Sequence, residues 1–215
     1  MTVAAAGVLP PRDCPLCPRL ASFRELQRSA HPAWFNGPVP PFGDDQAELL
    51  IVGLAPGLRG ANRTGRPFTG DYAGVLLYET LHKFGFARGE YGAHPDDGLE
   101  LIDCRITNAV RCVPPENKPT PEEIRTCRDF LIPTIGEMKK LRAIVTLGRI
   151  AHESTVRALG GKPSGVPFEH GSRRELKTLA LFCSYHCSRY NTNTGVLTPE
   201  MFRKVFTAVR RYLDA

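Results

Sequence analysis

Residues 49–71 read LLIVGLAPGLRGANRTGRPFTGD, and this stretch decides the fold. Its apolar start predicts a buried strand over residues 49–54, and a helical pattern begins near Asp71. Between them lies a glycine-rich loop, residues 53–71. A loop of this length between a strand and a helix is uncommon unless it binds a ligand. It is expected at the carboxyl end of the first strand, where open α/β sheets place their ligands.

Working outward, short apolar strands alternate with helices along the chain. This alternation is typical of a parallel sheet covered on both faces, so we expect a three-layer αβα sandwich with a central four-stranded parallel sheet. The four strands are expected at residues 49–54, 101–107, 143–147 and 179–184. The helices are expected at residues 20–30, 71–84, 121–140 with an interruption at Pro133, 150–159, and from Thr198 onward.

Two further loops are rich in residues that punctuate regular structure, residues 108–121 and residues 185–195. Each follows a predicted strand, as the loop at residues 53–71 does. Parallel strands all point the same way, so the three loops are expected at one edge of the sheet. The sequence therefore predicts that they converge on one cleft.

The totals are consistent with one domain. The chain has 215 residues, of which 42% are hydrophobic, and a net charge of +6. We expect a flexible arm over residues 1–12 and a single domain over residues 13–215, divided into an N-terminal segment (13–45) and the αβα core (46–215). No apolar run is long enough to span a bilayer and the N-terminus is a poor signal peptide, so we expect a cytoplasmic location and no membrane. The basic charge modestly favours a polyanionic partner.

Seven cysteines in a chain with no secretion signal argue against a disulfide framework and favour metal ligation for some of them. Cys14 and Cys17 form a C-x2-C pair, and Cys112 and Cys127 form a wide pair. Four such thiolates can hold zinc or an iron–sulfur cluster. Zinc ribbons use two tight pairs, so the spacing favours a cluster while leaving zinc open. The other three cysteines are interpreted as unligated: Cys104, Cys183 and Cys187.

Four motifs together carry a family likeness: GLAPG at 53–57, GANRTGRPFTGD at 60–71, TNAVRCVPPENKPTP at 107–121 and HCSRYNTNTG at 186–195. With the four cysteines, and in this order, they resemble the uracil-DNA glycosylase superfamily, and most closely its type B (family-five) branch. The likeness covers nearly the whole chain. Each motif alone is weak, whereas the set is highly specific.

The resemblance implies a monofunctional DNA glycosylase with an αβα core and a structural 4Fe–4S cluster held by Cys14, Cys17, Cys112 and Cys127. Other branches carry an acid within the first motif, where this chain has Ala55. That departure is typical of the type B branch, which accepts a wider set of deaminated bases. Expected substrates are uracil, and also hypoxanthine and xanthine, in DNA bound by a monomer.

The motif positions also imply roles in base excision. His186 would donate a hydrogen bond to the base and stabilise the leaving anion, Asn108 would read the base edge, and Phe68 would stack on the flipped base. The backbone amides of Ala55 and Gly57 would approach the base closely.

A carboxylate or a held water is needed where positive charge develops on the sugar. Asp71 is the candidate because it is the acid nearest the first motif, although it also suits a helix N-cap. Asn62 is the alternative residue for holding the water.

DNA contacts are expected from basic residues in or beside the three loops: Arg63, Arg66, Lys118, Arg149 and Arg189. Tyr190 or Arg189 lies where related enzymes push a side chain into the vacated stack. Two rival functions stay open at this point: a non-catalytic iron–sulfur or zinc module that binds nucleic acid, and an α/β hydrolase. The hydrolase is disfavoured because the chain lacks a G-x-S-x-G elbow.

Overall fold

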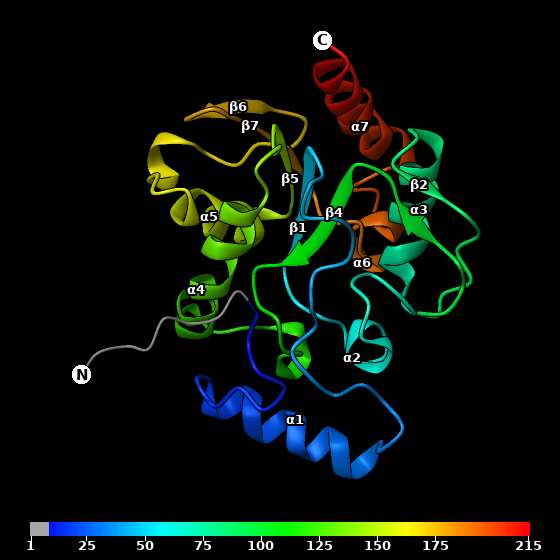
Figure 1. Cartoon of the computed structure of the whole chain (residues 1–215), viewed down its shortest axis with the longest axis vertical. Coiled ribbons are helices and arrows are strands. Elements are labelled where there is room, and N and C mark those ends of the chain that lie inside the picture. The colour runs from blue at the N-terminus through cyan, green and yellow to red at the C-terminus, as the bar shows by residue number, and fades with distance from the viewer. Residues whose placement is uncertain (1–8) are drawn as a thin grey trace.

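The computed structural model describes residues 9–215, and its centre is a parallel sheet (Figure 1). β1 (Leu49–Gly53) lies between β4 (Cys104–Asn108) and β5 (Ala143–Leu147), and β5 pairs on its other side with β7 (Leu179–Ser184). All of these pairings are parallel. The four expected strands and their shared direction are therefore confirmed.

A fifth strand, β6 (Arg173–Leu176), extends the sheet beyond the expected four. It runs antiparallel to β7, with Leu176 opposite Leu179 in a tight hairpin. The sequence of β6, RREL, is too charged to be recognised as a strand by its apolar content. Charged side chains suit an edge position, because they discourage further strand addition.

Helices cover both faces of the sheet and make the expected three layers. α3 (Tyr72–Lys83) and α7 (Pro199–Leu213) pack on the face that carries Ile51 and Val145. α4 (Pro121–Glu137) and α5 (Arg149–Ala158) pack on the opposite face, and Figure 1 shows the two helix pairs on either side of the strands. Because successive strand residues point to opposite faces, a strand buried on both sides is apolar throughout.

The expected strand over residues 101–107 is shorter and starts later than predicted. Leu101 belongs to a separate ribbon of β2 (Ala87–Arg88) and β3 (Glu100–Leu101). Asp103 has a left-handed φ of 49° and its carboxylate accepts a hydrogen bond from the backbone amide of Glu48. This turn separates the ribbon from β4.

α4 begins as predicted, with a capping box between Thr120 and Glu123 and a proline at its first turn. The predicted interruption at Pro133 is wrong, because the helix continues through it to Glu137. Thr134 Oγ1 donates to the carbonyl of Phe130 at 2.7 Å in this turn. The helix ends at Glu137, slightly before the predicted end at Lys140.

The remaining helical elements lie outside the two helix pairs that cover the sheet. They are α1 (Pro18–Ala30), α2 (Ala61–Thr64), η1 (Pro115–Asn117), η2 (Pro163–Gly165) and α6 (Arg189–Asn193). Of the expected flexible arm, residues 1–8 lie outside the described residues. Residues 9–12 adjoin α1, where Arg28 donates to the carbonyl of Arg12. Within residues 9–215, no helix combines the length and the apolar character that crossing a membrane requires.

Candidate active site

A cavity of about 700 Å3 opens at the carboxyl ends of β1 and β4. All three predicted loops contribute to its wall, so their expected convergence is observed. The residues that line it are Leu54, Ala55, Pro56, Gly57, Arg59, Ala61, Phe68, Gly70, Asp71, Tyr72, Ala73, Asn108, Asn117, His186, Ser188 and Arg189. This is the position at which open α/β sheets bind ligands.

Gly53 lets two side chains meet at the floor of the cavity. It lies opposite Asn108 in the register of β1 and β4. A Cβ at position 53 would be 2.3 Å from Asn108 Oδ1 and 2.6 Å from Phe68 Cζ. Asn108 Oδ1 is buried and has no hydrogen-bond partner among residues 9–215. A buried amide left unpaired is costly unless a ligand or water satisfies it, so Asn108 is suited to read a polar edge.

Asp71 places a carboxylate in the cavity. It occupies the N-cap position of α3, but its side chain makes no capping hydrogen bond. Its Oδ1 is buried and has no partner in the part of the chain that the structure describes, and a Cβ on Gly57 or Gly60 would lie 2.9 or 2.2 Å from its Oδ2. Burial raises the pKa of Asp71 above its usual value, and the backbone amides of Gly74 and Ala73 oppose that shift. The two glycines therefore make room for a buried carboxylate, one oxygen of which has no hydrogen-bond partner within residues 9–215.

His186 follows β7 and faces Phe68 across the cavity. The two rings stack with centroids 5.7 Å apart. Desolvation lowers the pKa of His186 to about 4, so the imidazole is neutral at pH 7. A neutral imidazole carries one N–H group, which can donate a hydrogen bond to the negative charge that develops on a departing base.

Asn62 does not line this cavity, in contrast to the prediction that it could hold the attacking water. It is fully buried in α2, and its Nδ2 donates to Asn36 Oδ1 at 2.9 Å. The side chain joins the loop to the segment before β1. Its local sequence motif could not reveal this partner, which lies 26 residues earlier.

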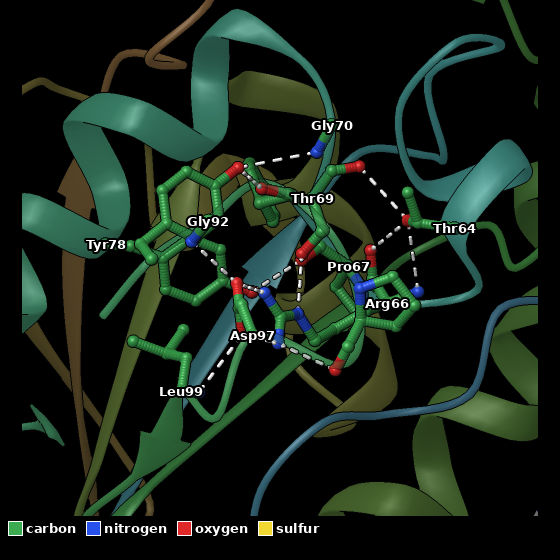
Figure 2. Close-up of polar contacts among 12 residues, drawn as sticks. Thr64, Arg66, Pro67, Thr69, Gly70, Tyr78, Gly92, Asp97 and Leu99 are labelled. Carbon is green, nitrogen blue, oxygen red and sulfur yellow. Dashed lines mark hydrogen bonds and ion pairs between the residues drawn. The ribbon is translucent and has the colours of Figure 1, made fainter. Parts of the chain in front are cut away.

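Arg66 also differs from its prediction as a DNA contact. Its guanidinium forms a two-pronged ion pair with Asp97 and both side chains are buried (Figure 2). A guanidinium paired in this way is unavailable to phosphate. The prediction failed because Asp97 lies 31 residues away in a polar connection that gave no sign of contacting the loop.

The other predicted DNA contacts are exposed: Arg63, Lys118, Arg149 and Arg189. Arg189 lines the cavity and its guanidinium lies over the ring of Tyr72 at 5.4 Å. Tyr190, next along α6, is 74% exposed. An exposed aromatic side chain beside the cavity is well placed to enter a base stack.

Several residues of the cavity wall were not predicted as site residues, and the polar or charged ones among them are Arg59, Tyr72, Asn117 and Ser188. All of them lie in or immediately beside the three loops. Asn117 has a left-handed φ of 58°, within the sequence PPENKP. Asparagine is enriched in this conformation, so an Asn within a proline-rich loop is the signal that the sequence offered.

The four cysteines of the predicted metal site come together between α1 and α4. Cys14, Cys17, Cys112 and Cys127 line one small cavity, whereas the other three cysteines are buried elsewhere. Burial raises the pKa of Cys112 and Cys17 to about 11. Such thiols ionise readily only when a cation binds them.

Two buried arginines face the same small cavity, Arg24 and Arg111. Arg24 lies 3.9 Å from Cys112 Sγ, and the backbone amide of Arg111 donates to Cys127 Sγ at 3.2 Å. Within residues 9–215, Arg24 Nε, Arg111 Nε and Arg111 Nη1 have no hydrogen-bond partner, although Arg24 Nε lies 3.8 Å from Glu25 Oε1 and Arg111 Nη2 donates to Thr134 Oγ1. Buried cations whose nitrogen atoms are only partly paired are costly, so an anionic group bound by the thiolates would fit this environment.

Among residues 9–215, no three metal-binding side chains lie close enough to hold a single ion. Thiolates around one zinc ion are bonded at about 2.3 Å, which brings the sulfur atoms into near contact. A multi-iron cluster places more atoms between its ligands. The four cysteines that line the small cavity are the residues that would hold either a zinc ion or a cluster.

Comparison with known proteins identifies the family. The family model described as "Uracil DNA glycosylase superfamily" matches residues 40–210. The chain belongs to the uracil-DNA glycosylase superfamily. The resemblance seen in the four motifs is thus confirmed, and the chain is an enzyme of the DNA glycosylase class.

Two relatives that match over most of both chains are described as type-5 enzymes. The chain is 46% identical to the "Type-5 uracil-DNA glycosylase" of Thermus thermophilus, over 92% of this chain and 93% of that protein. It is 39% identical to the "Type-5 uracil-DNA glycosylase" of Pyrobaculum aerophilum, over 90% and 86%. A "Type-4 uracil-DNA glycosylase" of the same archaeon matches at 38% over only 57% and 55% of the two chains.

Proposed function

We propose that this glycosylase removes uracil from DNA by hydrolysing the N-glycosidic bond of an extruded nucleotide. The observation that carries the proposal is one cavity in which Asp71, Asn108, His186 and Phe68 meet. Within residues 9–215, Asp71 Oδ1 and Asn108 Oδ1 are buried and have no hydrogen-bond partner. Enzymes that act on a base in DNA take it out of the stack into such a pocket.

Each side chain has a distinct task. Phe68 stacks on the base, and Asn108 donates to and accepts from its polar edge. As the bond from C1′ to the base breaks, its electron pair moves to the base, and the neutral His186 stabilises that charge by donating a hydrogen bond.

Water completes the reaction at the sugar. Asp71 carboxylate stabilises the positive charge that develops on the sugar and accepts a proton from the water that attacks C1′. The departing base gains a proton, so the products are free uracil and an abasic site.

The proposal includes deaminated purines, hypoxanthine and xanthine, as further substrates. The cavity of about 700 Å3 is roomy, and small residues, Ala55 and Gly57, form part of its wall. Ala55 stands where related branches place an acid, so the catalytic carboxylate comes from Asp71 at the far end of the same loop.

The proposal also includes a 4Fe–4S cluster bound by Cys14, Cys17, Cys112 and Cys127. When bound, the cluster would join the N-terminal segment to the loop before α4. Arg24 and Arg111 would balance its negative charge. A brown protein with visible absorption and about four irons per chain would support this assignment, whereas a colourless zinc protein would contradict it.

The exposed arginines and lysine around the cavity are proposed to bind the phosphates of DNA, and Tyr190 or Arg189 to fill the space left by the base. We propose further that the protein acts as a monomer in the cytoplasm, associated with the nucleoid through DNA.

A duplex with a single uracil tests the activity. Alkali cleaves the strand at an abasic site, so strand scission after incubation reports base release. Scission at the uracil position is expected. DNA binding without scission would instead favour the non-catalytic module that binds nucleic acid.

A further inference from the structure

A buried ion pair joins the cavity loop to the connection between β2 and β3. Arg66 Nη1 and Nη2 lie 2.7 and 2.6 Å from Asp97 Oδ1 and Oδ2, and the two side chains are only 6% and 2% exposed (Figure 2). Two parallel charge-assisted hydrogen bonds fix the direction of both groups. The ion pair therefore fixes the positions of Arg66 and Asp97 relative to each other in addition to pairing their charges.

Asp97 organises its own connection. Its Oδ2 accepts from the backbone amide of Gly92 at 2.9 Å, and its Oδ1 accepts from that of Leu99 at 3.0 Å. Hydrogen bonds from Arg66 and from these amides hold the pKa of the Asp97 carboxyl well below its usual value. At neutral pH the Asp97 carboxylate is therefore ionised, and both of its oxygens accept hydrogen bonds from neighbouring groups.

Arg66 is equally restrained on its other side. Its Nε donates to Thr69 Oγ1 at 2.8 Å, and its Nη1 reaches the carbonyl of Pro95 at 3.3 Å. The guanidinium lies over the rings of Phe42 and Tyr78, at 5.1 and 5.6 Å. Arg66 therefore ties the loop to aromatic side chains that pack on the sheet.

Two tyrosines hold the backbone between Arg66 and the cavity. Tyr78 donates to the carbonyl of Pro67 at 2.6 Å, and Tyr91 donates to the carbonyl of Phe68 at 3.2 Å. Tyr91 also accepts from the amide of Gly70 at 3.4 Å. Phe68 itself has a left-handed φ of 53°, which a bulky residue adopts only when its surroundings impose it.

We propose that Asp97, Arg66 and Tyr91 are positioning residues that hold Phe68 in the wall of the base cavity and so set how the extruded base stacks. None of the three is expected to touch the base. The inference rests on the proposed function in one respect, namely that the ring of Phe68 stacks on a base. It assigns a positioning role to a connection outside the three loops.

The rival explanation is that the ion pair only stabilises the fold. Glu48 and Arg142 provide a control of the same chemistry in a more exposed setting, because they form an ion pair at 3.1 Å and neither residue lines the cavity. Glu48→Gln and Asp97→Asn both replace a carboxylate with an amide of the same shape. Only Asp97→Asn should affect base release.

The test is a double-mutant cycle in single turnover on a uracil-containing duplex, with wild type, Asp97→Asn, Phe68→Ala and the double variant. Stacking of a base on an aromatic side chain is worth roughly 1–3 kcal/mol, so Asp97→Asn is expected to slow release roughly tenfold. In the Phe68→Ala background it should change the rate less than about twofold, because residues acting through one group are not additive. Glu48→Gln should leave the rate unchanged.

Equal slowing by Asp97→Asn in both backgrounds would overturn the proposal, as would a wild-type rate for Asp97→Asn alone. Tyr91→Phe, which removes only the hydroxyl bonded to Phe68, supplies a second cycle if Asp97→Asn does not fold. Its slowing must likewise vanish in the Phe68→Ala background.

Amide hydrogen exchange provides a readout without catalysis. Residues 66–71 should exchange faster in Asp97→Asn than in Glu48→Gln, and equal exchange would overturn the proposal. Absence of uracil release by the wild type would refute the proposed function instead, while this exchange comparison still judges the positioning of the loop.

Discussion

Replacing Gly60 with alanine should move the Asp71 carboxylate out of its place in the cavity. The added Cβ would lie 2.2 Å from Oδ2, 2.8 Å from Cγ and 3.0 Å from Cβ of Asp71. Ordinary contact begins at 3.4 Å, so the nearest oxygen must retreat by about 1.2 Å. A misplacement of about 1 Å can cost on the order of 10²-fold in rate, which corresponds to about 2.7 kcal/mol in the barrier.

Gly57→Ala makes the prediction graded. Its Cβ would lie 2.9 Å from the same oxygen, so the carboxylate needs to retreat by only about 0.5 Å and the loss should be smaller. Gly136→Ala in α4 is the control, since nothing lies within 4 Å of the added Cβ. The expected order of rates is wild type and Gly136→Ala, then Gly57→Ala, then Gly60→Ala.

The assay is single-turnover release of uracil from a labelled duplex, followed by alkali cleavage, with thermal unfolding of each variant alongside. DNA affinity should be similar in all four proteins, because the atoms nearest to an added Cβ at Gly57 or Gly60 all belong to Asp71 and not to a basic side chain. Rates for Gly60→Ala and Gly57→Ala within about twofold of wild type, in folded proteins, would refute the view that Asp71 acts from this position.

Other predictions follow from the same geometry. The wild-type rate should fall as pH drops through the raised pKa of Asp71, because the carboxylate must be ionised to accept a proton. A profile that is flat down to the usual carboxyl pKa would contradict this. Tyr190→Ala should slow release or weaken binding by roughly tenfold without changing Tm, since the ring is 74% exposed. Arg149→Gln should reduce the slope of log affinity against log salt by about one, and an unchanged slope would remove Arg149 from the phosphate contacts. Cys112→Ala should abolish visible absorption and lower Tm, whereas retained colour would exclude Cys112 as a ligand.

The overall fold could be predicted because the deciding patterns are local. Four apolar strands that alternate with helices specify a parallel sheet, and its direction places three loops at one edge. β6 could not be predicted, since only its pairing with β7 makes the charged sequence RREL a strand. The uninterrupted course of α4 through Pro133 depends on the surrounding core in the same way.

The same distinction between local patterns and tertiary contacts applies to the candidate site. The structure brings Phe68, Asp71, Asn108 and His186 into one cavity, because they lie on the segments that follow the parallel strands β1, β4 and β7 at the same edge of the sheet. The residue that each side chain contacts could not be predicted in this way. Arg66 is basic and lies in the correct loop, yet its charge is consumed by a carboxylate 31 residues away. Long-range pairs of this kind leave no mark in the local sequence.

The most direct test of the central claim is the single-turnover rate of uracil release by Asp71→Asn, measured beside its affinity for the same duplex. Replacing the carboxylate with an amide of equal size removes proton acceptance and charge while keeping the cavity filled. Loss of a general base costs about 10²–10⁴-fold, so a fall of at least about 10²-fold with unchanged affinity is predicted. A rate within about twofold of wild type would contradict the assignment of catalysis to Asp71.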